Sequence, residues 1–158
     1  MAGFKALSAL QAAGIAHAVH EIDCDPGDVG YARAAAGALG VDESRVFKTL
    51  VALVDGEPVI ALVPASAHLS LKAVAVAAGG KRAEMAPATL AERVTGYVVG
   101  GISPIGQKRA LPTFVDETAI LFETVFVSAG RRGLDVELAP DDLVGLTGAT
   151  YAPVAAPR

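Results

Sequence analysis

The chain has 158 residues, of which 53% are hydrophobic and 19% are charged, and its formal net charge at neutral pH is −4. This composition excludes an intrinsically disordered protein, and the length is sufficient to bury a core without metal ions or disulfides. No apolar stretch approaches the ~20 residues of a membrane-spanning helix. We therefore expect one folded domain over residues 1–151, followed by a frayed tail of prolines and small residues over 152–158.

The N-terminus and the cysteine content indicate the cellular compartment. Residues 1–5 contain no basic region followed by an apolar run, so we expect no secretory signal. Cys24 is the only cysteine and cannot form an internal disulfide, which agrees with a reducing compartment. Asp23 and Asp25 flank it and disfavour the thiolate, so it is a poor nucleophile. We predict a cytoplasmic protein without a membrane partner.

In the first half of the chain, apolar spacing and glycines predict two helices and a β-hairpin. Apolar residues share one face of a helix that Gly14 ends, and a second helix ends at Gly40. Two β-branched apolar runs are separated by Asp55-Gly56-Glu57-Pro58, which is a hairpin signal. In chain order, the predicted elements are a helix at 4–13, an extended segment at 15–22, turns at 23–28, a helix at 31–39, and strands at 47–54 and 59–63.

In the second half, strands outnumber the helices that connect them. Ser70 is an N-cap candidate for a helix that ends before Gly79-Gly80. In chain order, the predicted elements are helices at 71–78 and 89–94, strands at 97–99, 113–115, 124–128 and 134–138, and a helix at 141–146. Because strands and helices do not alternate uniformly, we predict a mixed α/β fold with a mixed sheet.

The charges are unevenly distributed along the chain. Residues 72–132 carry eight basic and five acidic groups, whereas the segments on either side are acidic. The basic residues include three doublets, Lys81-Arg82, Lys108-Arg109 and Arg131-Arg132. A basic region on an acidic protein can bind a few phosphates through counterion release, so we expect weak, salt-sensitive RNA binding. The alternative for each doublet is a solvated loop or helix end.

The segment 96–108 places two adjacent glycines, Gly100 and Gly101, and a Ser-Pro turn directly after a strand-like apolar run. Glycine tolerates positive φ and a close approach to the main chain, so this loop can direct N–H donors at an anion or a polarised carbonyl. The alternative is a structural bend between two strands. Ser103 precedes a proline and lies outside a Gly-x-Ser-x-Gly pattern, so we do not assign it as a nucleophile, and no P-loop pattern is present.

Three separated motifs carry a resemblance to a known family. They are Val46-Phe47-Lys48-Thr49-Leu50, Gly100-Gly101-Ile102-Ser103-Pro104-Ile105-Gly106-Gln107-Lys108, and Val-Ser-Ala-Gly-Arg-Arg-Gly-Leu-Asp-Val-Glu-Leu over residues 127–138. In their order and spacing they resemble the YbaK-type freestanding aminoacyl-tRNA deacylases, and the resemblance extends to about Tyr151. It implies a single α/β domain in which a curled, partly closed mixed sheet is flanked by helices.

The resemblance also implies an activity and its partners. The implied reaction is hydrolysis of the ester in a mischarged tRNA, most often Cys-tRNA(Pro), without a metal or another cofactor. In the resembled family the substrate's own thiol is the attacking group, so the protein mainly orients the ester and stabilises the oxyanion. The implied partners are the aminoacylated 3′ end of tRNA and prolyl-tRNA synthetase, and DNA is not among them. A non-catalytic module that binds aminoacyl-tRNA or an RNA end beside a synthetase is the alternative.

The resemblance assigns catalytic roles to Lys48 and Asp135. Lys48 is expected to contact the terminal nucleotide and polarise the ester, and the alternative is a lysine that extends from a strand end into solvent. Asp135 is expected to hold Lys48, the substrate ammonium or a ribose hydroxyl. The alternative left open by the alternation of the strand is that one of Asp135 and Glu137 points outward and has no function. The expected substrate-binding residues are Phe47, Gly100, Gly101, Ile102, Ser103 and Ser128, and the expected RNA contacts are Lys81, Arg82, Lys108, Arg109, Arg131 and Arg132.

Several polar residues outside these motifs have a structural interpretation. His17, His20, Asp23 and Cys24 are close in sequence, but residues three apart on an extended segment point to opposite faces, so we expect no zinc site. His68 has no partner in the sequence and is interpreted as structural or exposed. Where related deacylases often carry a tyrosine on the early strand, this chain has Ile22, so a hydroxyl contact is expected to be lost.

Overall fold

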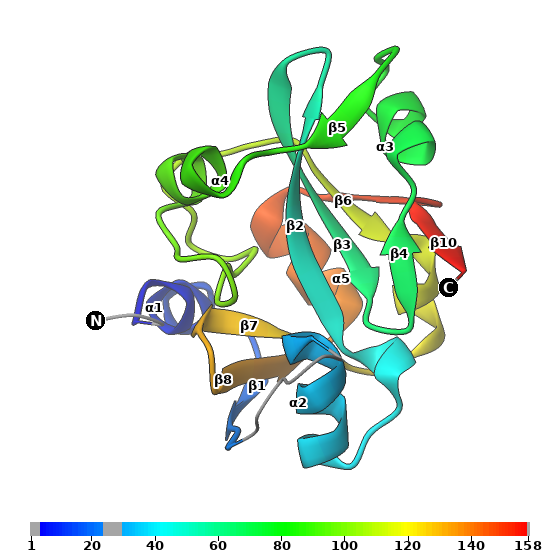
Figure 1. Ribbon diagram of the computed structural model, residues 1–158. Coiled ribbons are helices and arrows are strands. Elements are labelled where there is room, and N and C mark those ends of the chain that lie inside the picture. The colour runs from blue at the N-terminus through cyan, green and yellow to red at the C-terminus, as the bar shows by residue number, and fades with distance from the viewer. Residues whose placement is uncertain (1–3, 24–29, 158) are drawn as a thin grey trace.

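Five α-helices and ten strands occur in the residues that the computed structural model describes, which are 4–23 and 30–157 (Figure 1). The helices are α1 (Phe4–Ala13), α2 (Tyr31–Leu39), α3 (Leu71–Ala77), α4 (Ala88–Thr95) and α5 (Pro140–Thr147). The strands are β1 (His17–Glu21), β2 (Phe47–Val54), β3 (Glu57–Pro64), β4 (Ala67–Leu69), β5 (Ala83–Met85), β6 (Thr113–Asp116), β7 (Val125–Arg131), β8 (Leu134–Leu138), β9 (Thr150–Ala152) and β10 (Ala155–Pro157). All five predicted helices are confirmed, with ends that differ by no more than one residue. None of the helices described is long and apolar enough to cross a membrane.

The strands form three sheets. A five-stranded sheet has the order β5-β2-β3-β6-β9, a three-stranded antiparallel sheet has the order β1-β8-β7, and β10 pairs with β4. In the five-stranded sheet β2 is antiparallel to β3 and β5, whereas β6 is parallel to β3 and β9, so the predicted mixed sheet is confirmed. The strand orders are open over the described residues, and an isolated bridge between Val46 and Phe126 joins the two larger sheets.

The predicted hairpin of β2 and β3 is confirmed, with a shorter turn than the sequence indicated. Val54 pairs with Glu57, so the turn consists of Asp55 and Gly56, whose φ angles are 50° and 84°. Two-residue turns with positive φ match the twist of antiparallel strands, and Asp-Gly is a favoured pair for them. The Asp55 carboxylate also accepts the N–H groups of residues 81 and 82 at 3.0 Å each, which ties β5 to the hairpin tip.

Local signals begin and end the helices where the sequence indicated. The Ser70 hydroxyl accepts the N–H of Ala73 at 3.1 Å and so satisfies a donor in the first turn of α3. Left-handed glycines end α2 at Gly40 and α4 at Gly96. These boundaries depend on residues within one turn of the helix end, which is why the sequence was sufficient to predict them.

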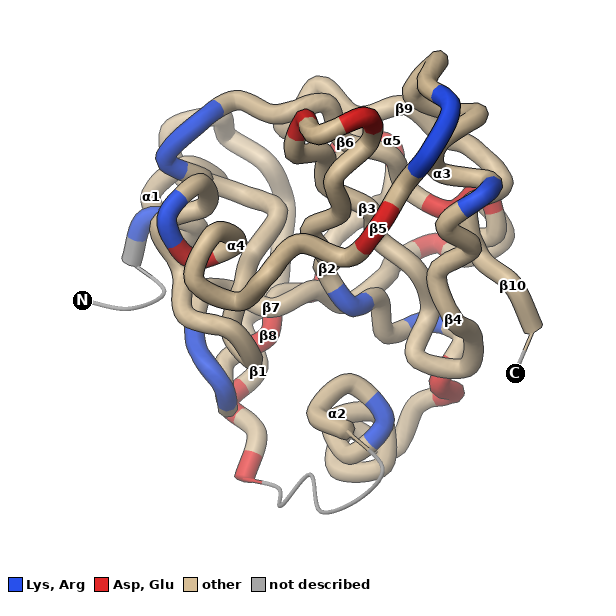
Figure 2. The backbone as a smooth tube through the Cα atoms, turned by 45° about the horizontal axis from the view of Figure 1, so that its top comes forward, with Lys and Arg blue, Asp and Glu red and all other residues tan. Residues whose placement is uncertain are grey.

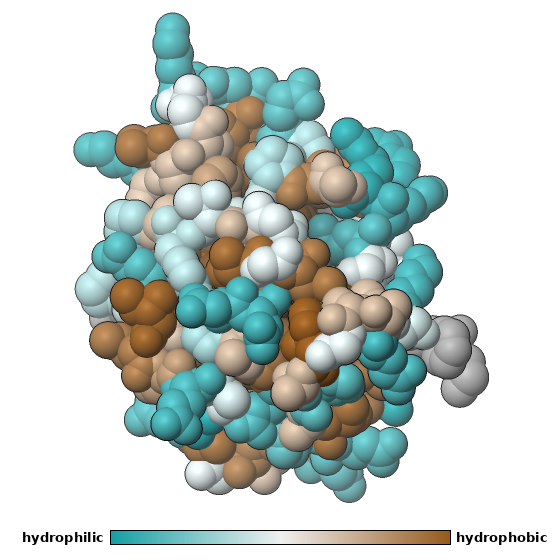
Figure 3. Space-filling view, turned by 180° about the vertical axis from the view of Figure 1, so that it is seen from behind, coloured by the Kyte–Doolittle hydropathy of each residue, from teal (hydrophilic) through white to brown (hydrophobic). Residues whose placement is uncertain are grey.

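Three clusters of buried side chains hold the elements together. The largest joins the two larger sheets through side chains such as Leu62 of β3 and Val136 of β8. A second packs α3 against the other face of β2 and β3 through Val74, and a third packs α2 against β7 through Ala36 and Phe126. On the face seen from behind, hydrophobic residues reach the surface in small areas separated by hydrophilic ones (Figure 3). Because α2 belongs to the third cluster, it lies beside the main core and bounds one side of a pocket.

The strand predicted over residues 97–99 is wrong. These residues form an irregular segment after α4. Tyr97 is buried and its hydroxyl donates to the carbonyl of Ile105 at 2.6 Å, whereas Val98 is 71% exposed. An apolar run of three residues cannot by itself distinguish a strand from a loop that inserts one aromatic ring into the core.

The frayed tail expected from residue 152 onward is also wrong for the part of it that the structure describes. Residues 155–157 form β10 on β4, and Val154 is fully buried. The buried carboxylate of Asp116 accepts the N–H groups of Val154 and Ala155 at 3.1 and 2.9 Å. This tail is held by partners far away in sequence, which its composition did not indicate.

Candidate active site

A pocket of about 230 Å³ lies where α2, the start of β2 and the β7–β8 hairpin meet. β2 contributes Phe47, Lys48 and Thr49, and the hairpin contributes Ser128 from β7 and Asp135 from β8. The remaining side includes Gly30, Tyr31, Ala32 and Arg33. Two of the three sequence motifs therefore meet in one pocket.

The pocket depends on an unpaired edge of β2. This strand pairs with β3 along its whole length, but with β5 only from Ala52 to Val54. Residues 47–50 consequently have an edge that no strand of the described chain covers, and β2 contacts β7 without forming a continuous ladder with it. Lys48 is half-buried at this edge.

Asp135 lies on the central strand of the three-stranded sheet, opposite His20 of β1 and Ser128 of β7. The residue is only 2% exposed, and its Oδ1 atom has no hydrogen-bond partner in the described structure. Burial raises the pKa of Asp135 from its ordinary value of 3.8 to about 7, while His20 and the hydroxyl of Tyr31 act in the opposite direction. A buried carboxyl group with an unpartnered oxygen and a strongly raised pKa is a candidate for a functional group.

Glu137 points to the same side of β8 as Asp135 but is bound to other side chains. Its Oε1 atom lies 2.9 Å from Nε2 of His20, and its Oε2 atom accepts the hydroxyl of Thr124 at 2.5 Å. The hydrogen bond from Thr124 is the largest cause of the lowered pKa of Glu137, with smaller contributions from His20 and Arg45. Of the two acids that the sequence left open, Asp135 is the one that lines the pocket.

Ser128 lies beside Asp135 as the register of β7 and β8 requires. Between Ser128 and Arg131 the pairing shifts, and the N–H of Gly130 donates to the Ser128 hydroxyl at 3.2 Å. Bulges of this kind re-aim side chains and are common next to active sites. A contact between Ser128 and a substrate stays a prediction.

The segment 96–108, which we call the glycine loop, lies next to the β7–β8 turn but does not line the pocket. A Cβ atom at Gly101 would be 2.6 Å from the Cα atom of Arg131, so the close packing of loop and turn requires glycine there. The Gly101 N–H donates to a carbonyl within the loop at 2.9 Å. Ser103 is fully buried, and its hydroxyl accepts the N–H of Ile105 at 3.2 Å. These contacts give a structural reason for the motif, and ligand binding by residues 100–103 stays a prediction.

The three basic doublets do not form one patch. Figure 2 shows basic residues near α1, α4 and the β7–β8 hairpin on one side of the molecule, and near β5 and α3 on the other. The doublet at 131–132 lies on the β7–β8 turn, roughly 10 Å along the strand from Ser128. The doublet at 81–82 adjoins the tip of the β2–β3 hairpin, roughly 20 Å along β2 from Lys48.

Sequence reasoning missed three residues with polar side chains that line the pocket, which are Tyr31, Arg33 and Thr49. The hydroxyl of Tyr31 accepts the N–H of Gly133 at 2.7 Å and hydrogen-bonds Asp135. The Thr49 hydroxyl oxygen is buried without a hydrogen-bond partner among the described residues. Tyr31 could have been noticed as a lone aromatic in the otherwise small Tyr-Ala-Arg-Ala-Ala-Ala helix, whereas Thr49 carried no signal beyond its place in the motif.

The structure describes most of the residues outside the three motifs to which the sequence analysis gave a structural interpretation. Nδ1 of His17 lies 2.7 Å from a backbone carbonyl, and His68 is exposed on β4. Ile22 is buried and its N–H donates to the carbonyl of Gly133 at 2.8 Å. Cys24 lies outside the described residues, and within them no three His, Cys, Asp or Glu side chains are arranged to hold a metal ion.

A larger hollow of about 560 Å³ lies between the β2–β3 hairpin and the end of α3. Of the site and RNA-contact residues predicted from the sequence, Arg109 alone lines it. The smaller pocket, which combines Lys48 and Asp135, is therefore the candidate active site.

Comparisons with known proteins relate the whole described fold to other chains. Residues 27–146 match the family model described as an aminoacyl-tRNA editing domain. A protein of Enterococcus faecalis, provisionally named Cys-tRNA(Pro)/Cys-tRNA(Cys) deacylase EbsC, is 41% identical over 124 residues, which are 78% of this chain and 76% of that protein. A proline–tRNA ligase of Maridesulfovibrio salexigens is 34% identical over 95 residues, which are 60% of this chain but 16% of the ligase. The crystal structure of a proposed trans-editing enzyme for prolyl-tRNA synthetase has a TM-score of 0.85 and 26% identity, covering 98% of this chain and 96% of that chain.

Proposed function

Because the chain belongs to the aminoacyl-tRNA editing domain family, we propose that it is a trans-editing deacylase that hydrolyses the ester of mischarged tRNA, with Cys-tRNA(Pro) as its main substrate. The relative from E. faecalis carries this substrate in its name. The observation that carries the proposal is the meeting of Lys48 and Asp135 in one pocket, together with Phe47 and Ser128. This arrangement supplies a cation and a buried acid beside an apolar wall.

Lys48 and Asp135 bind different parts of the aminoacyl group in the proposed complex. Oδ1 of Asp135 has no hydrogen-bond partner among the described residues, and in the complex it accepts a hydrogen bond from the α-ammonium group of the substrate. The Lys48 ammonium contacts the terminal nucleotide and the ester carbonyl oxygen, on which negative charge develops. The volume of about 230 Å³ lies below the ~300 Å³ at which pockets for drug-sized ligands begin, which suits an amino acid with a small side chain.

The proposed chemical step uses the thiol of the substrate. Its sulfur attacks the carbonyl carbon of the same cysteine, the bond from that carbon to the ribose oxygen breaks, and the thiol proton passes to the ribose oxygen. Water then opens the resulting cyclic thioester to free cysteine. An aminoacyl ester is already an activated acyl group, so the contribution of the protein is orientation and stabilisation of the oxyanion.

We assign the glycine loop a supporting part in this step. The amides of residues 100–102 bind the carbonyl oxygen or the terminal ribose once the RNA is in place. The contact between Gly101 and the β7–β8 turn supports this, because the same hairpin carries Ser128 and Asp135. Since the Gly101 N–H already donates within the loop, a contact through that amide requires a local rearrangement.

The body of the tRNA lies over the β7–β8 turn in this proposal. Arg131 and Arg132 are exposed there, close to the strand that carries Ser128. A phosphate backbone leaving the pocket along the hairpin would meet these two cations first. Lys81 and Arg82 at the hairpin tip of β2–β3 are too far from the pocket to contact the same few nucleotides.

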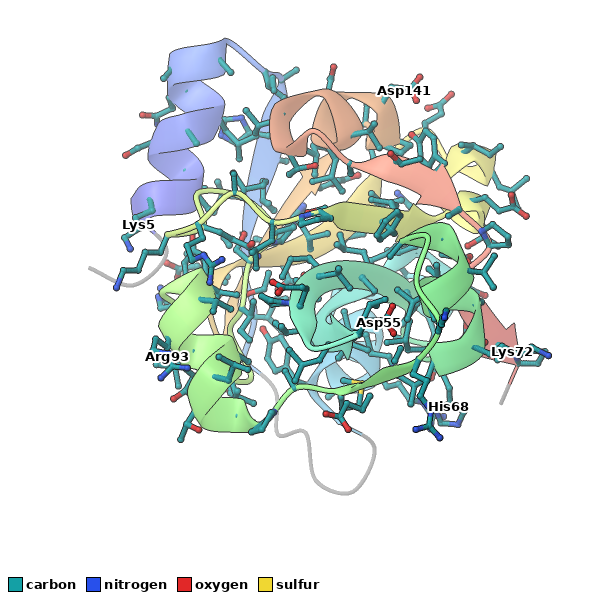
Figure 4. All side chains as sticks on the ribbon, turned by 90° about the horizontal axis from the view of Figure 1, so that it is seen from above. Lys5, Asp55, His68, Lys72, Arg93 and Asp141 are labelled. Atoms are coloured by element: carbon teal, nitrogen blue, oxygen red, sulfur yellow. The ribbon has the colours of Figure 1, made fainter. Side chains whose placement is uncertain are left out.

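Two basic residues outside the three doublets add to the proposed RNA-binding surface at the β7–β8 turn. Figure 4 shows Lys5 of α1 and Arg93 of α4 on one side of the molecule, with Lys72 of α3 on the opposite side. A Cβ atom at Gly96 would lie 3.3 Å from Nζ of Lys5, which places this lysine against the glycine loop. We therefore include Lys5 and Arg93 in the proposed RNA contacts, with Lys108 beside them.

The proposal also includes a partial closure of the two larger sheets and an association with prolyl-tRNA synthetase. The bridge between Val46 and Phe126 and the shared core support a partly closed arrangement of the two larger sheets. A segment similar to this chain occurs in proline–tRNA ligases, which supports a freestanding domain that acts beside prolyl-tRNA synthetase in the cytoplasm.

A panel of cysteinyl-, alanyl- and seryl-tRNA of the proline acceptor tests the function. We expect release of free amino acid to be fastest from the cysteinyl ester. Lys48→Ala should lose roughly 100-fold in rate, whereas Lys72→Ala, on the opposite side, should keep the rate of the unaltered protein. Undiminished deacylation by Lys48→Ala would remove this lysine from the mechanism. If the unaltered protein turns over none of the three esters, the binding module without turnover becomes the better description.

A further inference from the structure

Tyr31 links α2 to the strand that carries the catalytic acid. It is the first residue of α2 and lines the pocket together with residues of β2, β7 and β8. Its hydroxyl accepts the N–H of Gly133 at 2.7 Å and also hydrogen-bonds the carboxyl group of Asp135. Gly133 and Asp135 are two residues apart, so one hydroxyl group bridges two points on the same strand end.

The direction of these two hydrogen bonds follows from their partners. A backbone N–H can only donate, so the Tyr31 oxygen is the acceptor toward Gly133. A tyrosine hydroxyl has one proton, which is therefore available to Asp135. Because Oδ1 of Asp135 has no partner in the described structure, the contact with Tyr31 involves the other carboxyl oxygen, Oδ2.

We propose that Tyr31 is a positioning residue for the deacylation, because it fixes Oδ2 of Asp135 and leaves Oδ1 available to the α-ammonium group of the aminoacyl ester. This inference rests on the proposed function. The last torsion of an aspartate side chain has a broad, roughly two-fold preference, so the carboxyl group needs a partner to define its orientation. The N–H of Gly133 in turn holds the Tyr31 hydroxyl in place.

The elements packed against Asp135 differ in the charged groups that they bring near it. His20 lies opposite Asp135 on β1, and its Nε2 atom is 2.9 Å from Oε1 of Glu137. Lys48 of β2 and Arg33 of α2 line the same pocket. β7 contributes the uncharged Ser128 as the facing residue.

Tyr31 also affects whether Asp135 is ionised. Burial favours the neutral form, and the hydrogen bond from Tyr31 favours the ionised form. Only the ionised carboxylate is a pure acceptor for an ammonium group. Removing the Tyr31 hydroxyl should therefore weaken substrate positioning and make Asp135 harder to ionise.

The test compares Tyr31→Phe with Tyr151→Phe. Tyr31→Phe keeps the ring and removes the hydroxyl. Tyr151 is a matched control, because its hydroxyl donates to Oδ1 of Asp141 at 2.7 Å, outside the pocket. Two quantities are measured for each variant: the titration of the Asp135 carboxyl carbon by NMR in the free protein, and the pH profiles of kcat and KM with Cys-tRNA(Pro).

In Tyr31→Phe we expect the pKa of Asp135 to rise by roughly one unit, the shift that loss of a hydrogen bond to a charged group produces. The acid limb of the rate profile should move to higher pH by a similar amount. Near neutral pH, kcat should fall roughly tenfold, with a smaller change in KM. Tyr151→Phe should leave the Asp135 titration and the rate profile unchanged.

Three outcomes would overturn the inference. The first is an unchanged Asp135 titration in Tyr31→Phe. The second is a shifted titration with an unchanged kcat, which would show a contact without a part in the reaction. The third is an equal effect of Tyr31→Phe and Tyr151→Phe. If the unaltered protein hydrolyses no aminoacyl-tRNA, the proposed function fails, while the NMR titration still decides whether Tyr31 controls the ionisation of Asp135.

Discussion

Replacing Asp135 by Asn should stabilise the folded protein at neutral and alkaline pH while abolishing deacylation. Asn has nearly the same shape as Asp but does not ionise. In the folded protein burial raises the pKa of Asp135 from 3.8 to about 7, so ionising this group works against folding. The residue is 2% exposed, so solvent does little to reduce this effect.

The pH dependence has a definite sign. A carboxyl group with a raised pKa in the folded state holds its proton there after the unfolded chain has lost it. The unfavourable contribution is absent below the unfolded value of 3.8, grows as the pH rises, and is complete above about 7. A shift of about three units corresponds to roughly 4 kcal/mol, which is a large part of the 5–15 kcal/mol stability of a typical domain.

Urea denaturation followed by circular dichroism, at several values between about pH 4 and pH 8, measures this effect. The free energy of unfolding of Asp135→Asn should be close to that of the unaltered protein at the acid end and should exceed it increasingly toward the alkaline end. Glu137→Gln is the control, because the pKa of Glu137 is lowered. Its loss of stability should be greatest at the alkaline end and should disappear as the pH falls. A difference between Asp135→Asn and the unaltered protein that does not change with pH would refute the burial argument.

Three further predictions concern the loop, the RNA contacts and metal dependence. Gly101→Ala places a Cβ atom 2.6 Å from the Arg131 Cα atom and should lower stability by about 1–3 kcal/mol, whereas Gly145→Ala, in open space on α5, should raise it by about 0.5–1 kcal/mol; thermal melts that rank the two variants the other way would contradict this packing. Replacing Arg131 and Arg132 together by Ala should reduce the slope of log binding constant against log salt by roughly 0.7 for each lost phosphate contact, with no change for Lys72→Ala. A metal chelator should leave the deacylation rate unchanged, and a loss restored by added metal would disprove the proposed chemistry.

The raised pKa of Asp135 also gives the active site a physical rationale. A buried carboxyl group with an oxygen that has no hydrogen-bond partner among the described residues destabilises the fold. In the proposed complex, the substrate ammonium supplies that partner. Function and stability therefore oppose each other at this residue, as is common at active sites.

Much of this protein could be predicted from its local sequence. The helices, the Asp55-Gly56 hairpin and the Ser70 cap depend on residues within a few positions, because helix periodicity, turn conformation and capping are local properties. The resemblance of three short motifs was sufficient to identify the family, and it pointed to Lys48 and Asp135 in the pocket.

Only the tertiary structure decided how these parts meet. The register of β7 and β8 places Ser128 beside Asp135, and the free edge of β2 brings Lys48 to the same pocket. The tertiary structure also holds the expected frayed tail in place, because the buried carboxylate of Asp116 accepts the N–H groups of Val154 and Ala155. Pairing between distant strands is selected by which faces can be buried together. That choice depends on the whole folded chain, so short-range patterns in the sequence cannot determine it.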